Sequence, residues 1–287
     1  MTTANRQPAA PFDADLFTEF EHSGWQQKAN GWYEHFEAVS TQSVGALLDA
    51  VEITADGPNA GRRVLDVATG PGYAAGEAVR RGAKGYGLDF SSVQVELAQQ
   101  NFPQAQYQVG DAEDLPFGND TFDAVVINFG LQHFAAPDRA LREAYRVLRP
   151  GGRIAYTVWA SPPLVVGFSI VQQAIETHGD PYADIPAGPP YYRFSEAAES
   201  RRSLSAAGFK AARVSDVPQT WRFGDPDHVL IAIADGTVRS GALFRAQSPA
   251  ARCAIAVAVR DAAKTYRKGG VIELPMPAVL ASATKLV

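Results

Sequence analysis

Glycines and an acidic side chain follow one apolar segment of the chain in a pattern that is typical of a nucleotide-type site. Residues 64–73 read Val-Leu-Asp-Val-Ala-Thr-Gly-Pro-Gly-Tyr, an apolar strand that runs into a Gly-x-Gly turn. Glycine lets the backbone approach a ligand closely and adopt a positive φ. The helix expected next presents free N–H groups at its N-terminus. The sequence therefore predicts a ligand site around Gly70 and Gly72.

Asp66 indicates what kind of ligand this site takes, because it lies inside the strand, four positions before Gly70. A carboxylate there can hold a cationic ammonium group, which favours an amino-acid ligand over a pyrophosphate. Gly70, Gly72 and Ala75 also satisfy the dinucleotide pattern, but that pattern alone is weak. The chain has no Tyr-x-x-x-Lys pair for hydride transfer, which disfavours a nicotinamide cofactor. The alternative for Asp66 is that it only caps loop amides.

Three further strands are expected to end in polar side chains at the same edge of the sheet. Asp89 follows Asp66 by 23 positions, a spacing at which a carboxylate accepts hydrogen bonds from both ribose hydroxyls; a solvated loop aspartate is the alternative. The Asp111 side chain can accept a hydrogen bond from the adenine amino group, and the Ala112 N–H can donate one to the ring. Asn128 ends the fourth strand. Open α/β sheets bind ligands at the carboxyl ends of parallel strands, so these positions predict a nucleoside site.

His133 is the candidate catalytic base, since it follows the fourth strand at the rim where an acceptor would lie. The alternative is a loop histidine that packs or caps the next helix. His35 is a weaker candidate. The five histidines and one cysteine show no metal-ligand spacing, so we expect no metal.

The elements that must position these residues alternate strictly between strand and helix. Strands are expected at Arg63–Ala68, Lys84–Leu88, Gln106–Val109, Phe122–Asn128 and Arg153–Trp159, and helices at 72–81, 91–101 (opened by Ser91) and Pro137–Leu148. This order predicts an α/β fold with a doubly wound, Rossmann-like, mostly parallel sheet. Further helices are expected at Phe12–Val51, Val165–His178, Ser195–Ala207 (with Ser195 as N-cap) and 226–267. Lys210–Phe223 is expected to form a strand pair or one long strand, and Val271–Leu286 a strand.

Two groups of aromatic side chains flank this core. Trp25, Trp32, Tyr33 and Phe36 recur at helical spacing, either as a face packed on the sheet edge or as a lid over the ligand. The segment 162–194 is a second wall, in which an apolar pocket favours an aromatic or isoprenoid-like acceptor. Its candidate lining residues are Phe168, Tyr182, Tyr191, Tyr192 and Phe194.

Five motifs together resemble class I S-adenosylmethionine-dependent methyltransferases, and most of all the branch that includes ubiquinone/menaquinone-biosynthesis methyltransferases (methyltransferase domain type 11). They are Val-Leu-Asp-Val-Ala-Thr-Gly-Pro-Gly, Gly-Leu-Asp-Phe-Ser, Gly-Asp-Ala-Glu-Asp-Leu-Pro-Phe, Thr-Phe-Asp-Ala-Val and Arg-Val-Leu-Arg-Pro-Gly-Gly-Arg. The resemblance covers residues 62–160, and it implies a seven-stranded sheet and S-adenosyl-L-methionine as cofactor. The helix after Asp89 lacks the methionine that is common in this family, which puts the adenine wall in doubt.

The resemblance also implies a role for each matching position. Asp66, Thr69, Gly70 and Gly72 would surround the methionine end of the cofactor. Asp89 would hold the ribose, and Phe90 would lie beside the adenine. Asp111 and Ala112 would recognise the adenine edge, and Asn128 would lie under the methionine portion. In similar enzymes an N-terminal helix covers the site, and Tyr33 is best placed on it to contact the cofactor.

Composition narrows the class of protein. A net charge of −5 over 287 residues gives no electrostatic footprint for nucleic acid. A single cysteine suits a reducing cytoplasm. We see no signal peptide and no run of about 18 apolar residues that would span a bilayer. Residues 1–11 are polar and Pro/Ala-rich, which predicts disorder.

We expect one methyltransferase domain over 1–287: an N-terminal helical lid (1–52), a cofactor-binding core (62–160), a substrate-side insertion (161–208) and C-terminal strands with a helical insertion (209–287). The helices at 226–267 either form a homodimer surface or fold back on their own domain. The expected function is methyl transfer to a small-molecule acceptor at carbon, nitrogen or oxygen. The alternatives are a cofactor-binding cyclase or regulator on the same scaffold and an NAD-linked oxidoreductase.

Overall fold

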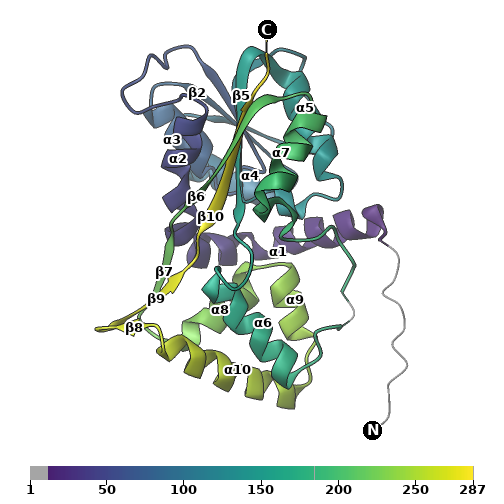
Figure 1. Ribbon diagram of the computed structural model, residues 1–287, viewed down its shortest axis with the longest axis vertical. Coiled ribbons are helices and arrows are strands. Elements are labelled where there is room, and N and C mark those ends of the chain that lie inside the picture. Colours follow the sequence, from purple (N-terminus) through teal and green to yellow (C-terminus); the bar gives the residue numbers. More distant parts are fainter. Residues whose placement is uncertain (1–11, 184, 287) are drawn as a thin grey trace.

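A seven-stranded sheet forms the centre of the protein, whose computed structural model describes residues 12–183 and 185–286 (Figure 1). Its strands lie in the order β3-β2-β1-β4-β5-β10-β6, and only β10 runs antiparallel to its neighbours. This confirms the predicted α/β fold with a mostly parallel seven-stranded sheet. The strands are β1 (Arg63–Val67), β2 (Lys84–Asp89), β3 (Gln106–Val109), β4 (Phe122–Asn128), β5 (Leu148–Trp159), β6 (Lys210–Val217) and β10 (Ala278–Thr284).

Alternate residues of the central strands are buried on opposite faces of the sheet, because successive side chains of a strand point to opposite sides. Val64 and Val126 belong to one buried cluster, and Leu65 and Val125 to another. Each cluster needs a layer of helices to cover it, which explains the doubly wound arrangement. The helices of this part are α2 (Val44–Ala50), α3 (Tyr73–Arg80), α4 (Ser92–Asn101), α5 (Pro137–Val147) and α7 (Ala197–Ala206).

The start of α4 is as predicted, and the start of α7 is not. Ser91 caps α4, since its side chain accepts a hydrogen bond from Gln94 N. Ser195 does not cap α7, because residues 193–195 form a separate 3₁₀ turn, η3 (Arg193–Ser195), in which the Ser195 hydroxyl donates to Tyr192 O at 2.7 Å. Helix α7 begins after Glu196, whose side chain makes no capping bond.

The C-terminal strands divide between two sheets. Lys210–Phe223 forms two strands, β6 and β7 (Thr220–Phe223), as the strand-pair alternative predicted. The single strand expected at Val271–Leu286 is instead divided into β9 (Val271–Pro275) and β10. Strand β7 pairs with β9, which pairs with β8 (Arg267–Lys268). Prolines stand at both breaks, Pro218 after β6 and Pro277 before β10. Because proline has no N–H to donate to a ladder, each break is a natural point for the chain to change sheets.

Four helices form a layer of their own below the main sheet, which we call the helical cap (Figure 1). They are α6 (Val166–His178), α8 (Asp227–Gly236), α9 (Arg239–Arg245) and α10 (Pro249–Lys264). The long helix α1 (Ala14–Ser40), followed by a 3₁₀ turn η1 (Thr41–Ser43), runs between the cap and the sheet (Figure 1). Prediction of a helical segment at Phe12–Val51 is therefore correct.

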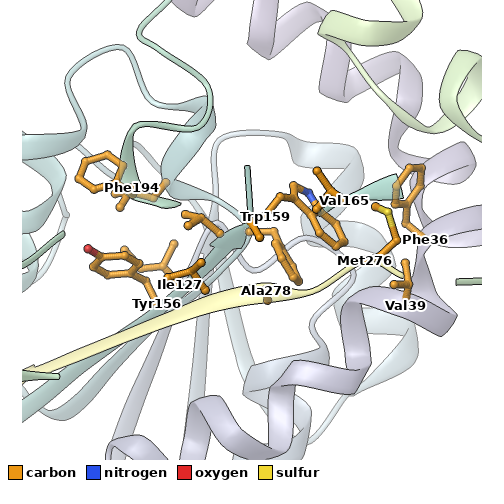
Figure 2. Close-up of a cluster of buried hydrophobic side chains, with 14 of the residues drawn as sticks. Phe36, Val39, Ile127, Tyr156, Trp159, Val165, Phe194, Met276 and Ala278 are labelled. Atoms are coloured by element: carbon orange, nitrogen blue, oxygen red, sulfur yellow. The ribbon is translucent and has the colours of Figure 1, made fainter. Parts of the chain in front are cut away.

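The buried core runs without interruption from the sheet into the cap. Figure 2 draws part of it, with Trp159 from β5 close to Val165 and Met276 near Phe36 of α1. Trp159 and Phe36 are 1% and 0% exposed, so this junction is as closed as the sheet interior. Across the described residues, no helix combines the length and apolar character needed to cross a membrane. Residues 1–11, for which disorder was predicted, lie outside the described residues.

Candidate active site

The carboxyl ends of β1, β2 and β4 and the loop after β3 meet at one cavity beside α1. The strand order reverses between β1 and β4, and this switch point is where open α/β sheets bind ligands. Nine of the predicted site residues line the cavity: Asp66, Thr69, Gly70, Asp89, Phe90, Asp111, Ala112, Asn128 and His133.

The loop after β1 turns sharply to reach the start of α3. Ala68 and Gly70 adopt positive φ values of 55° and 52°. Two bonds tie the loop to β2: Thr69 N donates to Leu88 O at 2.9 Å, and Gly70 N donates to Asp89 Oδ2 at 2.9 Å. The loop backbone is therefore fixed against the next strand and lies open to the cavity.

Asp66 is 1% exposed, and its two oxygens have different surroundings. Oδ2 accepts hydrogen bonds from Thr69 Oγ1 at 2.7 Å and from Ala75 N at 3.1 Å, whereas Oδ1 is buried without a hydrogen-bond partner in the described structure. Burial raises the pKa of Asp66 to about 7. The loop-capping interpretation thus accounts for one oxygen only, and the other is suited to a cationic ligand group.

Asp89, which is 5% exposed, is held by the backbone on both sides. Its Oδ2 accepts from Gly70 N and its Oδ1 from Ser91 N at 3.0 Å. Burial raises the pKa of Asp89 to about 6, although these two amides favour the ionised form. Each oxygen keeps acceptor capacity for a diol, because a carboxylate oxygen has more than one lone pair. The solvated-loop alternative does not apply to a carboxyl this deeply buried.

The loop after β3 and the residue after β2 line the opposite part of the cavity. Asp111 is exposed, and its Oδ1 accepts from Glu113 N at 2.8 Å. Ala112 is 7% exposed. The half-buried Phe90 ring meets His22 of α1 edge-on, with centroids 5.2 Å apart. Phe90 and Ala112 thus provide apolar surface in this part of the cavity, and Asp111 provides a polar group beside it.

Asn128 joins β4 to its surroundings through every polar atom of its side chain. Its Oδ1 accepts from Thr157 Oγ1 at 2.6 Å and from Ser43 Oγ at 3.0 Å. Its Nδ2 donates to Ser40 O at 3.1 Å. Asn128 therefore connects the sheet to the end of α1, in addition to lining the cavity.

His133 ends the 3₁₀ turn η2 (Leu131–His133) that follows β4. Its Nδ1 lies 3.0 Å from Oε2 of Glu21 on α1, and Trp25 Nε1 donates to the same oxygen at 3.1 Å. The rings of Trp25 and Tyr191 meet the imidazole edge-on, at centroid distances of 5.0 and 5.7 Å. The imidazole is thus held from several sides.

Tyr33 and Gly72 are not among the residues that line the cavity, and their predicted contacts with the cofactor stay predictions. Gly72 has φ +91°, and a Cβ there would lie 2.8 Å from Tyr107 Oη and 3.0 Å from Ala98 Cβ. Its glycine is needed for packing against β3 and α4. Tyr33 packs beside the buried cluster that includes Tyr73.

Sequence reasoning missed several residues at the site. Glu21 is the most important of them. The only sequence feature that pointed to it was its spacing, because Trp25 follows four residues later on the same face of the helix. Gln94, in the first turn of α4, lines the cavity with an Oε1 that has no partner among the described residues. Of the aromatic stripe on α1, Trp25 and Trp32 line the cavity and Phe36 lies in the core.

A second cavity of about 440 Å³ lies in the helical cap. Four of the five predicted aromatic residues line it: Phe168, Tyr182, Tyr191 and Tyr192. Phe194 does not, because it is 2% exposed and packs against Tyr156 in the core. Tyr191 contacts both His133 and this cavity, so it lies between the two sites. Within residues 12–183 and 185–286, no three His, Cys, Asp or Glu side chains gather as metal ligands would.

Comparison with known proteins identifies a domain within the chain. Residues 65–156 match the family described as a methyltransferase domain. The demethylmenaquinone methyltransferase of Clavibacter sepedonicus is 36% identical over 124 residues, which is 41% of this chain and 51% of that protein. The chain thus spans about half the length of the curated relatives it matches.

Two solved structures share the fold at low sequence identity. Phosphoethanolamine N-methyltransferase 2 of Haemonchus contortus, solved with S-adenosyl-L-methionine, has a TM-score of 0.58 at 17% identity, covering 98% of this chain and 62% of that one. The cyclase SpnF has a TM-score of 0.55 at 21% identity, covering 97% and 98%. A methyltransferase and a cyclase therefore share this architecture, so fold alone does not choose between them.

Proposed function

Since residues 65–156 carry a domain of the methyltransferase family, we propose that the protein binds S-adenosyl-L-methionine and transfers its methyl group to a small-molecule acceptor. The observation that carries the proposal is the unpartnered Oδ1 of Asp66, buried at the end of β1 and 23 positions before the buried Asp89. The first suits an ammonium group and the second a ribose diol. A pyrophosphate would be repelled by a carboxylate at this position, because it binds to cations and to amide donors.

The residues around these carboxyls fit the rest of the cofactor. We propose that Asp66, Thr69 and Gly70 hold its methionine end, Asp89 its ribose, and Phe90, Asp111 and Ala112 its adenine. Asn128, with its own hydrogen bonds made within the protein, supplies a fixed wall beneath the methionine portion. The cofactor supplies a methyl group on a positively charged sulfur, which is already activated for displacement. The protein's main contribution is therefore to position the acceptor.

His133 is the base in this proposal, because it lines the cavity and its Nε2 makes no hydrogen bond to a described residue. The acceptor is proposed to be aromatic or isoprenoid-like, as the names of the menaquinone-pathway relatives and the aromatic cavity of the cap both favour. Tyr191 and Tyr192 would contact it between the two cavities. The acceptor is thus proposed to belong to the quinone-like class.

Calorimetry tests the cofactor. We expect S-adenosyl-L-methionine to bind, NADH not to bind, and Asp89→Asn to weaken binding at least tenfold, because an amide replaces one ribose acceptor with a donor. Asp56→Asn, the same change at an exposed position, is the control and should bind as the parent does. Binding of NADH alone, or of neither ligand, would overturn the proposal.

Methyl transfer is tested with cofactor labelled in its methyl group and demethylmenaquinone reduced to its quinol. Label in the organic extract supports the proposed activity and acceptor class. Tight cofactor binding with no label transferred would instead favour the cyclase or regulator alternative, for which the cyclase of similar fold is the precedent. The variant His133→Ala should lower the rate by about 10²–10⁴-fold if a base is needed.

The compartment and the assembly state belong to the proposal as well. We propose the cytoplasm, because the single cysteine gives no internal disulfide. The homodimer through 226–267 stays a prediction; exposed Ile231 and Val257 on α8 and α10 are the side chains that would contribute. Sedimentation at several concentrations distinguishes monomer from dimer.

A further inference from the structure

A buried carboxylate on α1 has no role in the cofactor site described above. Glu21 is 0% exposed, and its Oε1 has no hydrogen-bond partner in the described structure. Its Oε2 contacts His133 Nδ1 at 3.0 Å and Trp25 Nε1 at 3.1 Å. Burying a carboxyl group without full pairing is costly, so a residue of this kind points to a function beyond holding the helix in place.

The contact uses only one nitrogen of the imidazole. Nδ1 faces Glu21, and among the described residues Nε2 has no hydrogen-bond partner. A carboxylate is an acceptor only, so a neutral His133 must carry its proton on Nδ1 to make this bond. Nε2 is then left with its lone pair. The rings of Trp25 and Tyr191 pack edge-on against the imidazole.

Several other titratable groups face this pair. Asp89 lies across the cavity and interacts electrostatically with His133 and with His22 of α1. Tyr191, which lies just before η3, interacts electrostatically with Glu21, and burial raises the pKa of its phenol far above the usual range, so it stays neutral. Arg239 of α9 lies over the Tyr191 ring at 5.5 Å, and Tyr192 is beside it. None of these groups makes a hydrogen bond to His133 in the described structure, whereas Glu21 does.

We propose that Glu21 is a positioning residue that holds His133 with its proton on Nδ1, so that Nε2 accepts a proton from an acceptor whose attacking group is a hydroxyl or an enol. The inference rests on the proposed function and narrows its substrate class to acceptors that must lose a proton. A tertiary amine or a thioether, which has no such proton, would not need this arrangement.

The reaction balances with the groups named. The acceptor's O–H bond breaks, and its proton goes to Nε2. The electron pair that remains on the acceptor forms the bond to the methyl carbon, while the carbon–sulfur bond breaks and its electron pair stays on sulfur. The imidazolium, stabilised by Glu21, then returns its proton to water. An oriented carboxylate behind a histidine serves the same purpose in other base-catalysed reactions.

Nitrogen NMR of the free protein tests the tautomer without any acceptor. In protein labelled with ¹⁵N-histidine, the ring resonances of His133 are assigned by their loss in His133→Gln. We expect the Nδ1–H tautomer in the parent protein and a shift toward Nε2–H in Glu21→Leu. Glu19→Leu, at an exposed position on the same helix, is the control and should leave the tautomer unchanged. An Nε2–H tautomer in the parent protein overturns the inference even if Glu21→Leu does not fold.

Kinetics with reduced demethylmenaquinone test the consequence for proton transfer. Glu21→Gln keeps the shape of the side chain and removes its charge. We expect kcat to fall about 10–100-fold with an unchanged affinity for S-adenosyl-L-methionine. The acid limb of the kcat/KM profile should move to lower pH, since an imidazolium without its carboxylate is less stable.

The outcomes separate the two proposals. A parent-like pH profile in Glu21→Gln contradicts the inference and leaves the proposed methyl transfer intact. Failure of the protein to bind S-adenosyl-L-methionine contradicts the proposed function, whatever the tautomer of His133. Loss of cofactor binding in Glu21→Gln would assign Glu21 to the cofactor site instead, and would also contradict the inference.

Discussion

A carboxyl group that is buried with one oxygen unpartnered, as in Asp66, is costly to ionise in the free protein. Its pKa is raised to about 7, so near neutral pH a large fraction of the free protein carries a proton there. A cationic ligand group pairs only with the ionised form. Ligand binding and loss of this proton are therefore linked.

The link predicts how cofactor affinity depends on pH. Between about pH 5.5 and 7 the affinity for S-adenosyl-L-methionine should rise with pH, because less work is needed to deprotonate Asp66 as the pH approaches its pKa of about 7. Binding should release protons in this range, which calorimetry in buffers of different ionisation enthalpy detects. Asp66→Asn should bind more weakly and show a flatter profile. Proton uptake on binding would contradict the assignment.

Residues at the ends of consecutive strands were predictable, and residues brought together by distant segments were not. Asp66 and Asp89 lie at the carboxyl ends of β1 and β2, and Asp111 follows β3, so the edge they share could be inferred from the strand order alone. Glu21 and His133 are 112 positions apart, and neither sequence segment contains a feature that predicts contact with the other. For Gly72, the sequence alone does not separate a ligand contact from a packing requirement, because both favour glycine.

Among the helices, α1 and α8 approach each other closely because glycines lie at their contact. A Cβ on Gly31 of α1 would lie 2.3 Å from the carbonyl oxygen of Asp235, and one on Gly236 of α8 would lie 2.8 Å from the Phe36 ring. From sequence, these glycines only weaken the prediction of helix, since glycine is a poor helix former. Their purpose is visible only with both helices in place.

Gly31→Ala should therefore destabilise the protein by about 1–3 kcal/mol, because a backbone carbonyl cannot move aside as a side chain can. It should also weaken cofactor binding, since α1 contributes Trp25 and Trp32 to the cavity. The control is Gly45→Ala in α2, where the nearest atom to the new Cβ is 3.5 Å away. That change should be neutral or stabilising by about 0.5–1 kcal/mol. Denaturant unfolding and calorimetry measure both effects, and equal stabilities of the two variants would contradict the packing argument.

At the level of the whole molecule, the order of elements through β5 was predictable and the later part less so. Strictly alternating strands and helices leave few topologies for residues 62–160. Sequence does not decide whether residues 210–223 form one strand or two, because the same alternation occurs in both sheets and only Pro218 marks the change. The cap could be recognised as helical from its composition, but its contact with α1 depends on packing between distant segments.

The division of the chain into one domain over 1–287 stays a prediction, and unfolding tests it. The four tryptophans are Trp25, Trp32, Trp159 and Trp221, and all belong to or pack against the core shared by sheet, α1 and cap. Because that core is continuous, we expect tryptophan fluorescence and far-ultraviolet circular dichroism to report one coincident thermal transition. Two separated transitions would indicate that the cap and the sheet unfold as independent domains.

The position of β10 between β5 and β6 has a consequence for the time course of folding. Within the described sheet β6 pairs only with β10, and β10 follows it after the whole of segment 218–277. Strand β6 therefore has no partner until that segment, with its three helices, has brought β10 into the gap beside β5. Pairings this distant in sequence are slow to form. Pulse-labelling of amide hydrogens during refolding should show β1 and β4 protected first, and β6 and β10 acquiring protection together and later.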